Sequence, residues 1–173
     1  MALWRISSQR LLIKLGGKIM RTMLLSFKPS VYEKIKNGVK IFEHRRSFPD
    51  EPIKAYMYVS SPVCAITGIL YLGKRYDLRD WEREFAEDEA ALERIRKYLE
   101  SYKYVMEVVE FQETTKIPLA KVREDIEGFV APQMYYYLDG KPLLKYIEDN
   151  LENKEVNVKH TFERIVSTQV CVH

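Results

Sequence analysis

The order of the apolar segments is the feature that most limits how this chain folds. Runs with strand character lie at 22–28, 40–48, 54–61, 64–73, 104–119 and 160–172. Helices are predicted after Pro29, near 119–126 and after Pro142. Because helices do not alternate regularly with strands, a doubly wound parallel sheet is disfavoured. The pattern predicts an α+β fold, with a mixed or antiparallel sheet curled into a small barrel and helices over its ends.

One segment changes the apolar period from that of a strand to that of a helix. Its apolar residues recur at spacings of three, four and seven, namely Trp81, Phe85, Leu92, Ile95, Leu99 and Tyr102. Residues 77–103 carry nine acidic and six basic side chains, whereas the whole chain has a net charge of +3. We expect a helical insertion at about 78–103, broken near 87–89. Its apolar stripe either packs on the barrel or docks a protein partner.

The remainder of the chain is predicted to form one domain at 23–173, which is long enough to bury a core. Residues 1–22 contain no acidic residue and are interpreted as a basic N-terminal extension. A targeting peptide or a membrane-surface helix is the alternative for this segment. The sequence has no apolar run long enough to span a membrane, and we expect a cytoplasmic protein.

The cysteines and histidines show no ligand spacing. Cys64 and Cys171 are far apart, and His44, His160 and His173 are scattered. We therefore expect no metal and no cofactor, and nothing in the sequence requires an oxidising compartment.

Charges of both signs follow an Asn-Gly turn in the stretch "NGVKIFEHRR". In a strand, Glu43 and Arg45 share one face and can pair, while His44 and Arg46 face the other way. Lys40 stands at the mouth of this strand and can bend towards Glu43. A solvated edge, where an ion pair contributes at most about 1 kcal/mol, is one interpretation. The other is a cleft that offers a cation to a phosphate and a carboxylate to a base amino group.

Five segments in the same order resemble ASCH domains, which are PUA-like β-barrels named for activating-signal-cointegrator homology. The opening pattern Gly-x-Lys-x-x-Glu-x-Arg is met by Gly38, Lys40, Glu43 and Arg45. The later segments are "YMYVSSPV", "TGILYLG", "YVMEVVEFQETTKIPL" and "APQMYYYL", the last with alanine where the family usually has proline. The resemblance covers about 23–138. It implies a PUA-like small β-barrel with capping helices.

The resemblance also implies a function. ASCH-type modules are expected to bind RNA or a nucleotide-like ligand, here in a cleft lined by Lys40, Glu43 and Arg45, in transcription or RNA-linked regulation. Arg46 is predicted to touch a phosphate from the rim.

Two further segments supply candidate ligand contacts. Ser60 and Ser61 form either a strand-ending turn or the floor of the cleft. Gln133 is predicted to read a base edge, and Tyr135 or one of the two tyrosines after it to stack on a base.

An enzyme is the alternative that the same resemblance raises. Some small bacterial ASCH proteins are amidohydrolases that act on acetylated cytidine with a lysine, a threonine and a glutamate. Lys40 matches that lysine, but Glu43 stands at the threonine position, and no residue clearly matches the glutamate. In such an enzyme Glu43 would act as a general base and Lys40 would stabilise an oxyanion. A nucleic-acid-binding module is the favoured prediction.

Overall fold

The computed structural model describes residues 14–15 and 18–173, so most of the predicted extension 1–22 lies outside the described residues. The strands are β1 (Lys14–Leu15), β2 (Lys18–Ile19), β3 (Arg21–Phe27), β4 (Phe42–Arg45), β5 (Ile53–Val59), β6 (Ala65–Asp77), β7 (Tyr104–Pro118), β8 (Tyr135–Tyr137) and β9 (Asn153–Lys159). The helices are α1 (Pro29–Lys36), α2 (Leu78–Glu84), α3 (Glu89–Leu99), α4 (Leu119–Asp125) and α5 (Pro142–Asn150), with a 3₁₀ turn η1 (Ser167–Gln169). Across this described part, no helix has both the length and the apolar character to cross a membrane.

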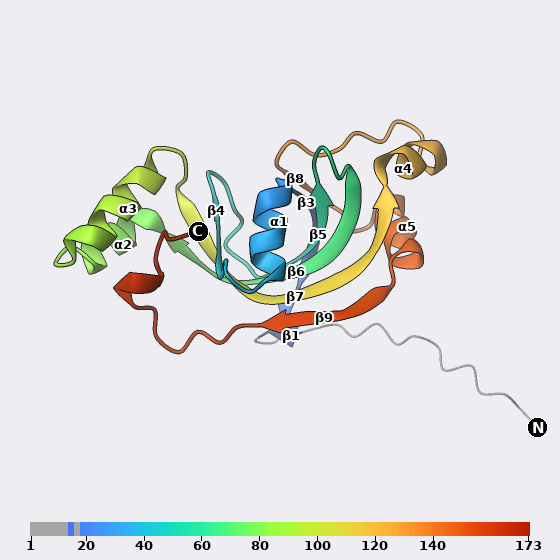
Figure 1. Cartoon of the computed structure of the whole chain (residues 1–173). Coiled ribbons are helices and arrows are strands. Elements are labelled where there is room, and N and C mark those ends of the chain that lie inside the picture. The colour runs from blue at the N-terminus through green and yellow to red at the C-terminus, as the bar shows by residue number, and fades with distance from the viewer. Residues whose placement is uncertain (1–13, 16–17) are drawn as a thin grey trace, which may run out of the picture.

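A mixed seven-stranded sheet forms the body of the molecule. Its strand order is β4-β7-β6-β5-β3-β8, and β9 also pairs with β7. β3 and β5 are parallel, whereas the other pairs of this sheet are antiparallel. Figure 1 shows the long strands β6 and β7 curving around α1, which lies in the hollow of the sheet. The predicted α+β fold with a curled sheet and covering helices is confirmed.

The two faces of the sheet bury separate cores because side chains alternate along each strand. In β3, Met23 and Leu25 face the hollow, where Tyr32 and Ile35 of α1 join them. Leu24 faces the opposite side and belongs to the cluster that α4 and α5 cover. The helix in the hollow therefore leaves little open space except towards β4.

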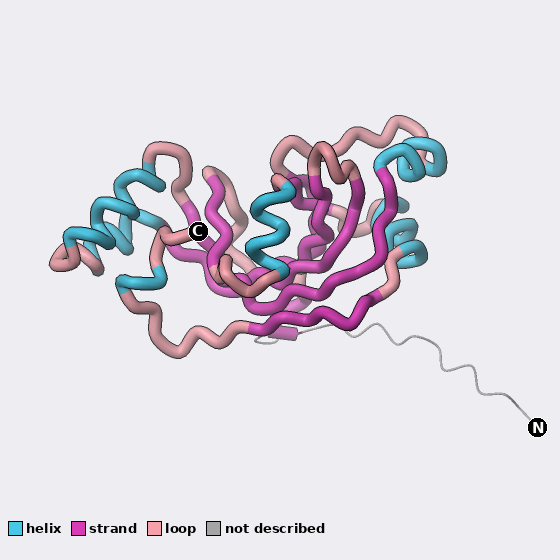
Figure 2. The backbone as a smooth tube through the Cα atoms, viewed as in Figure 1, coloured by secondary structure: helices cyan, strands magenta, loops and turns pink. Residues whose placement is uncertain are grey.

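The insertion forms two helices at one end of the sheet (Figure 2). Trp81 of α2 and Ile95 of α3 are buried against Phe42 of β4. The break between α2 and α3 falls near its predicted place. Here the Asp88 side chain accepts a hydrogen bond from the backbone nitrogen of Ala91 and so caps the start of α3. Much of the apolar stripe thus packs on the barrel.

The predicted strand at 160–172 is wrong. β9 ends at Lys159, and residues 160–166 form neither helix nor strand before η1. The reason lies in the edge of β7. Residues 104–107 of β7 already pair with β4, so β9 can occupy only the part of this edge near 110–114.

Gly68 interrupts β6 where the sequence predicts a bulge or a close approach, and both are present. The pairing register with β7 shifts here, and the φ angle of Gly68 is +86°. A Cβ atom at this position would lie 2.9 Å from Phe111 Cε2 and 3.2 Å from Tyr32 Cε2. The position therefore requires glycine both for its backbone angle and for the closeness of α1.

Gly68→Ala is expected to lower the free energy of unfolding by about 2–4 kcal/mol, the sum of a left-handed backbone penalty and overpacking. Gly140→Ala is the matched control, because Gly140 also has a positive φ, +71°, but a Cβ atom added there would meet no atom within 4 Å. Its loss should be about 1 kcal/mol. Urea unfolding of both variants measures the difference, and equal losses would contradict the steric argument.

Candidate functional site

The centre of the candidate site is the buried carboxylate of Glu43 on β4. Its Oε1 accepts a hydrogen bond of 2.8 Å from Arg45 Nε, which is the pairing that strand alternation predicts. Its Oε2 lies 3.6 Å from Lys40 Nζ. Within residues 14–15 and 18–173, this second oxygen has no hydrogen-bond partner. One carboxylate is thus placed between two cations with one acceptor position unused.

Arg45 fixes the site to a distant strand. Its Nη2 donates a hydrogen bond of 2.6 Å to the backbone oxygen of Ser26 on β3, and its Cζ lies 5.0 Å from the centroid of the Phe27 ring. β3 and β4 are separated by three strands in the sheet order. The side chain therefore bridges the hollow of the curled sheet, and this bridge limits the movement of its guanidinium.

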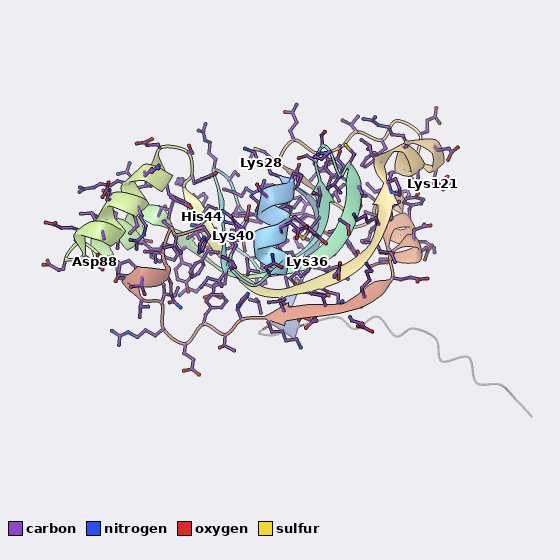
Figure 3. All side chains as sticks on the ribbon, in the orientation of Figure 1. Lys28, Lys36, Lys40, His44, Asp88 and Lys121 are labelled. Atoms are coloured by element: carbon purple, nitrogen blue, oxygen red, sulfur yellow. The ribbon has the colours of Figure 1, made fainter. Side chains whose placement is uncertain are left out.

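Lys40 and His44 form the other half of the cluster (Figure 3). Lys40 lies just before β4 and is only 6% exposed, with its Nζ 3.5 Å from His44 Nδ1. The prediction that His44 faces away from the site is wrong, because Lys40 is not part of the strand and its side chain folds back onto both Glu43 and His44.

Burial controls the protonation of both side chains. It lowers the pKa of Lys40, and the nearby Glu43 carboxylate opposes this change. Burial, reinforced by the positive charge of Lys40, holds the pKa of His44 well below its usual value of 6.5. His44 is therefore a neutral imidazole at neutral pH, and the positive charge of the cluster resides on Lys40 and Arg45.

A pocket of about 370 Å³ opens beside this cluster. Lys40, Glu43 and His44 line one wall, and Tyr98 and Tyr102 from the insertion line the other. The His44 and Tyr98 ring centroids are 4.6 Å apart, and Tyr102 is 39% exposed. Tyr98 and Tyr102 are residues that sequence reasoning missed as site residues, although both belong to the predicted insertion; Tyr98 lies on α3, and Tyr102 lies three residues beyond its end.

A second pocket, also about 370 Å³, adjoins the first. Glu100, Ser101 and Tyr102 line both pockets, so the two pockets are neighbours on either side of this segment, and together they are called the groove. The cations that line the second pocket are Arg46, Arg79 and Lys103. Arg46, predicted at the rim, is exposed here.

Comparison with known proteins supports one fold. No protein-family model and no curated protein matches the sequence. The crystal structure of ASCH from Zymomonas mobilis matches with a TM-score of 0.59 and 20% identity, over 78% of this chain and 99% of that one. The chain has the ASCH fold.

Two variants of the Zymomonas mobilis ASCH protein give similar matches. A serine-to-alanine mutant has a TM-score of 0.57 over 78% of this chain and 97% of its own, and a tyrosine-to-phenylalanine mutant has 0.56 over 76% and 99%. Both are 19% identical to this chain. At this identity the likeness establishes the ASCH fold and does not extend to a ligand. It agrees with the motifs seen in the sequence.

The remaining predicted residues of the ASCH motifs lie outside the groove. The predicted residues that line neither pocket are Ser60, Ser61, Gln133, Tyr135 and also Arg45, which reaches the site only through Glu43. Ser61 and Gln133 are exposed, and Tyr135 is half-buried with its ring edge-on to Tyr137. Tyr102, by contrast, lines both pockets.

These outlying segments still converge on the strand that Arg45 contacts. The backbone nitrogen of Ser60 donates to the oxygen of Phe27, and that of Ser26 donates to the oxygen of Met134, both at 2.9 Å. The end of β3 therefore joins both segments to the Arg45 bridge. They are neighbours of the site but do not form its walls.

The low pKa of His44 predicts that stability falls with acidity. As the pH falls through about 6.5, the unfolded chain binds a proton at His44 that the folded chain does not, so the free energy of unfolding decreases. Between pH 7.5 and 5.5 this loss amounts to about 1.4 kcal/mol. Urea unfolding at both pH values should show a smaller loss in His44→Gln. An unchanged pH dependence in that variant would contradict a neutral, buried imidazole. Burial also lowers the pKa of His160, so the difference between the two proteins isolates His44.

Proposed function

We propose that this chain is a nucleic-acid-binding module of the ASCH fold, which binds single-stranded RNA with one nucleotide in the pocket beside Lys40, Glu43 and His44. The observation that carries the proposal is the Glu43 Oε2 oxygen, which has no hydrogen-bond partner among the described residues and belongs to a cluster of two cations, Lys40 and Arg45, with one carboxylate. RNA-linked regulation, including transcription, is the role that such binding would serve.

The charges around Lys40 favour an anionic ligand. Glu43 is the carboxylate that acts on Lys40, whereas Arg45 and Lys34 are further cations nearby. Partly buried positive charge that exceeds the local negative charge is stabilised by a phosphate group. Glu43 Oε2 would accept a hydrogen bond from a base amino group, which is the type of contact that a carboxylate makes with a base edge.

The groove also fits a single strand of RNA better than it fits an isolated nucleotide. Tyr102 is exposed between the two pockets and can stack on a base. Beyond it, Arg46 and Lys103 line the second pocket and would receive the phosphate of the adjoining nucleotide. A longer RNA strand would pass the end of β3 and would there contact Ser60, Ser61, Gln133 and Tyr135.

Lys40→Ala is expected to weaken binding of a pool of short single-stranded RNA about tenfold or more, since it removes a buried charge that contacts phosphate. Arg45→Ala should act in the same direction. Fluorescence anisotropy at two salt concentrations should show a salt dependence that is shallower in both variants. Lys121→Ala on α4 is the matched control, because Lys121 is exposed and pairs with Asp125 away from the groove. Equal effects at Lys121 would indicate non-specific attraction only.

Glu43→Gln tests the proposed base contact separately. The substitution preserves shape but replaces an acceptor-only oxygen pair with an amide, so discrimination among the four homopolymeric RNAs should decrease while the salt dependence remains. Competition titrations measure this discrimination. Unchanged affinity and unchanged discrimination would show that Glu43 takes no part in the site.

The amidohydrolase alternative makes a different claim about the same cluster. Lys40 Nζ and Glu43 Oε2, 3.6 Å apart, would then stabilise an oxyanion and activate water. Release of acetate from an acetylated cytidine by the native chain, lost in Lys40→Ala and without measurable RNA affinity, would replace the binding proposal with this one.

A further inference from the structure

The segment near the C-terminal end of the chain lies over the candidate site. Lys40 Nζ donates a hydrogen bond of 2.9 Å to the backbone oxygen of His173, and Cys171 Sγ lies 3.9 Å from His44 Nε2. Val170 and Cys171 are buried between β4 and α3. Figure 1 places the C-terminal end beside β4. A backbone oxygen therefore occupies one of the three N–H donors of Lys40, on the side where a phosphate would bind.

We propose that residues 167–173 form a strap that Arg94 holds closed over Lys40, and that this strap must open before a ligand reaches Lys40. This inference rests on the proposed function, because it concerns access to the same pocket. Its evidence is independent of the ligand, since it consists of contacts within the chain.

Arg94 on α3 is the main polar attachment of the strap. Its Nη2 donates to the backbone oxygen of Ser167 at 2.8 Å, and its Nε donates to that of Val170 at 3.1 Å. Among the described residues, no backbone-to-backbone hydrogen bond joins residues 161–173 to another segment. Arg94 thus holds the strap at Ser167 and at the buried Val170, while Lys40 holds its far end at His173, and loss of Arg94 would remove the first two contacts together.

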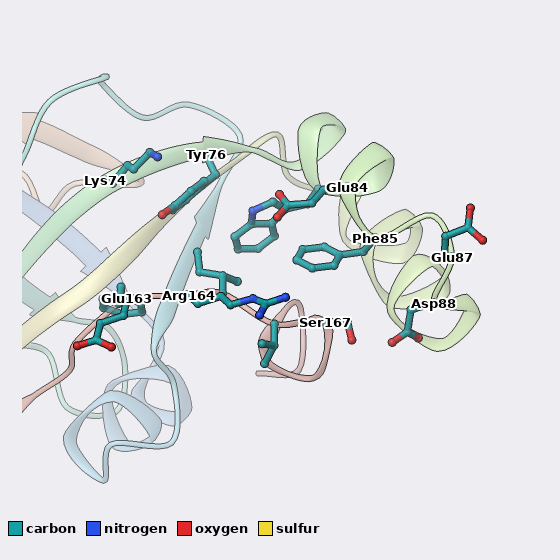
Figure 4. A pocket seen from close by; sticks show the side chains of 13 residues that line it. Lys74, Tyr76, Glu84, Phe85, Glu87, Asp88, Glu163, Arg164 and Ser167 are labelled. Carbon is teal, nitrogen blue, oxygen red and sulfur yellow. The ribbon is translucent and has the colours of Figure 1, made fainter.

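The chain leading to the strap borders an open pocket. Residues 162–167 line one side of a pocket of about 810 Å³, and α2 with the loop after it lines the other. Figure 4 shows Arg164 and Ser167 across this space from Glu84 and Phe85, with the Glu163 carboxylate directed away from them. The approach to the strap therefore has room to move on the side of this pocket, while Phe162 and Ile165 pack against the apolar cluster around Trp81.

The backbone of the strap is also strained. Cys171 has a φ of +54°, a left-handed conformation that residues with a side chain rarely adopt. Strain of this kind persists only where surrounding contacts impose it. Opening the strap would relieve it, which reduces the cost of opening.

Cys171 provides a direct readout of the closed state. It and Cys64 are the two cysteines of the chain, so Cys64→Ser leaves a single thiol. In the closed strap Cys171 is buried, and burial raises its pKa to about 12, so that a thiol reagent reacts slowly. Reaction of the full chain with such a reagent therefore reports how often the strap opens.

The experiment measures Cys171 labelling and RNA affinity in the Cys64→Ser chain, alone and with Arg94→Ala or Arg96→Ala. Arg96 is the matched control, because it lies on the same helix and has the same charge but bonds Glu82 instead of the strap. Arg94→Ala should label about tenfold faster and bind the short RNA pool more tightly, whereas Arg96→Ala should do neither. In the Cys64→Ser chain that retains both Arg94 and Arg96, added RNA should accelerate the labelling of Cys171.

Other outcomes are equally informative. Slower labelling with RNA would show that the strap closes onto the ligand, and unchanged labelling while RNA is bound would show that the two do not compete; either result overturns the proposal. If no protein binds RNA, the proposed function fails. The strap is then supported or rejected by the labelling rates of Arg94→Ala and Arg96→Ala alone.

Discussion

The contact of Glu43 with Arg45 on one side and Lys40 on the other determines the geometry of the site. A buried carboxylate requires compensation, and two cations from different parts of the chain supply it. Arg45 then continues to Ser26 on β3 and so connects strands that are not neighbours in the sheet. β4 itself is placed by its pairing with β7 and by the packing of Phe42, and the charges then fix the direction of the Lys40 and Arg45 side chains.

Such a cluster is a poor means of stabilising a fold. Removing charges from water costs several kcal/mol for each ion, and apolar residues of similar size often give equal or greater stability. Here the three charges do not even balance, and one carboxylate oxygen has no hydrogen bond among the described residues. An arrangement that adds little to stability but keeps donors and an acceptor ready is typical of a binding site. This physical argument favours ligand binding over a solvated edge, because both Lys40 and Glu43 are buried.

Local rules in the sequence account for much of the fold. Alternation placed Met23 and Leu24 on opposite faces, Pro29 marked the start of α1, and Gly68 marked the bulge. The site could be predicted only in part. The Glu43–Arg45 pair follows from alternation, but His44 and Tyr102 do not, since their positions depend on where Lys40 folds and where the insertion packs. The misplaced strand at 160–172 has a similar cause, because the edge of β7 was already occupied by β4.

The insertion therefore has a role that its sequence did not reveal. Its apolar stripe packs α2 and α3 against β4, and the same packing brings Tyr98 and Tyr102 to the groove. Arg94 lies one helical turn before Tyr98 on α3, and its side chain contacts Ser167 and Val170. One helix thus supplies Tyr98 to the wall of the pocket and Arg94 to the segment whose last residue contacts Lys40. If that segment controls access to Lys40 as we propose, a shift of α3 relative to β4 would change the pocket and this access at once.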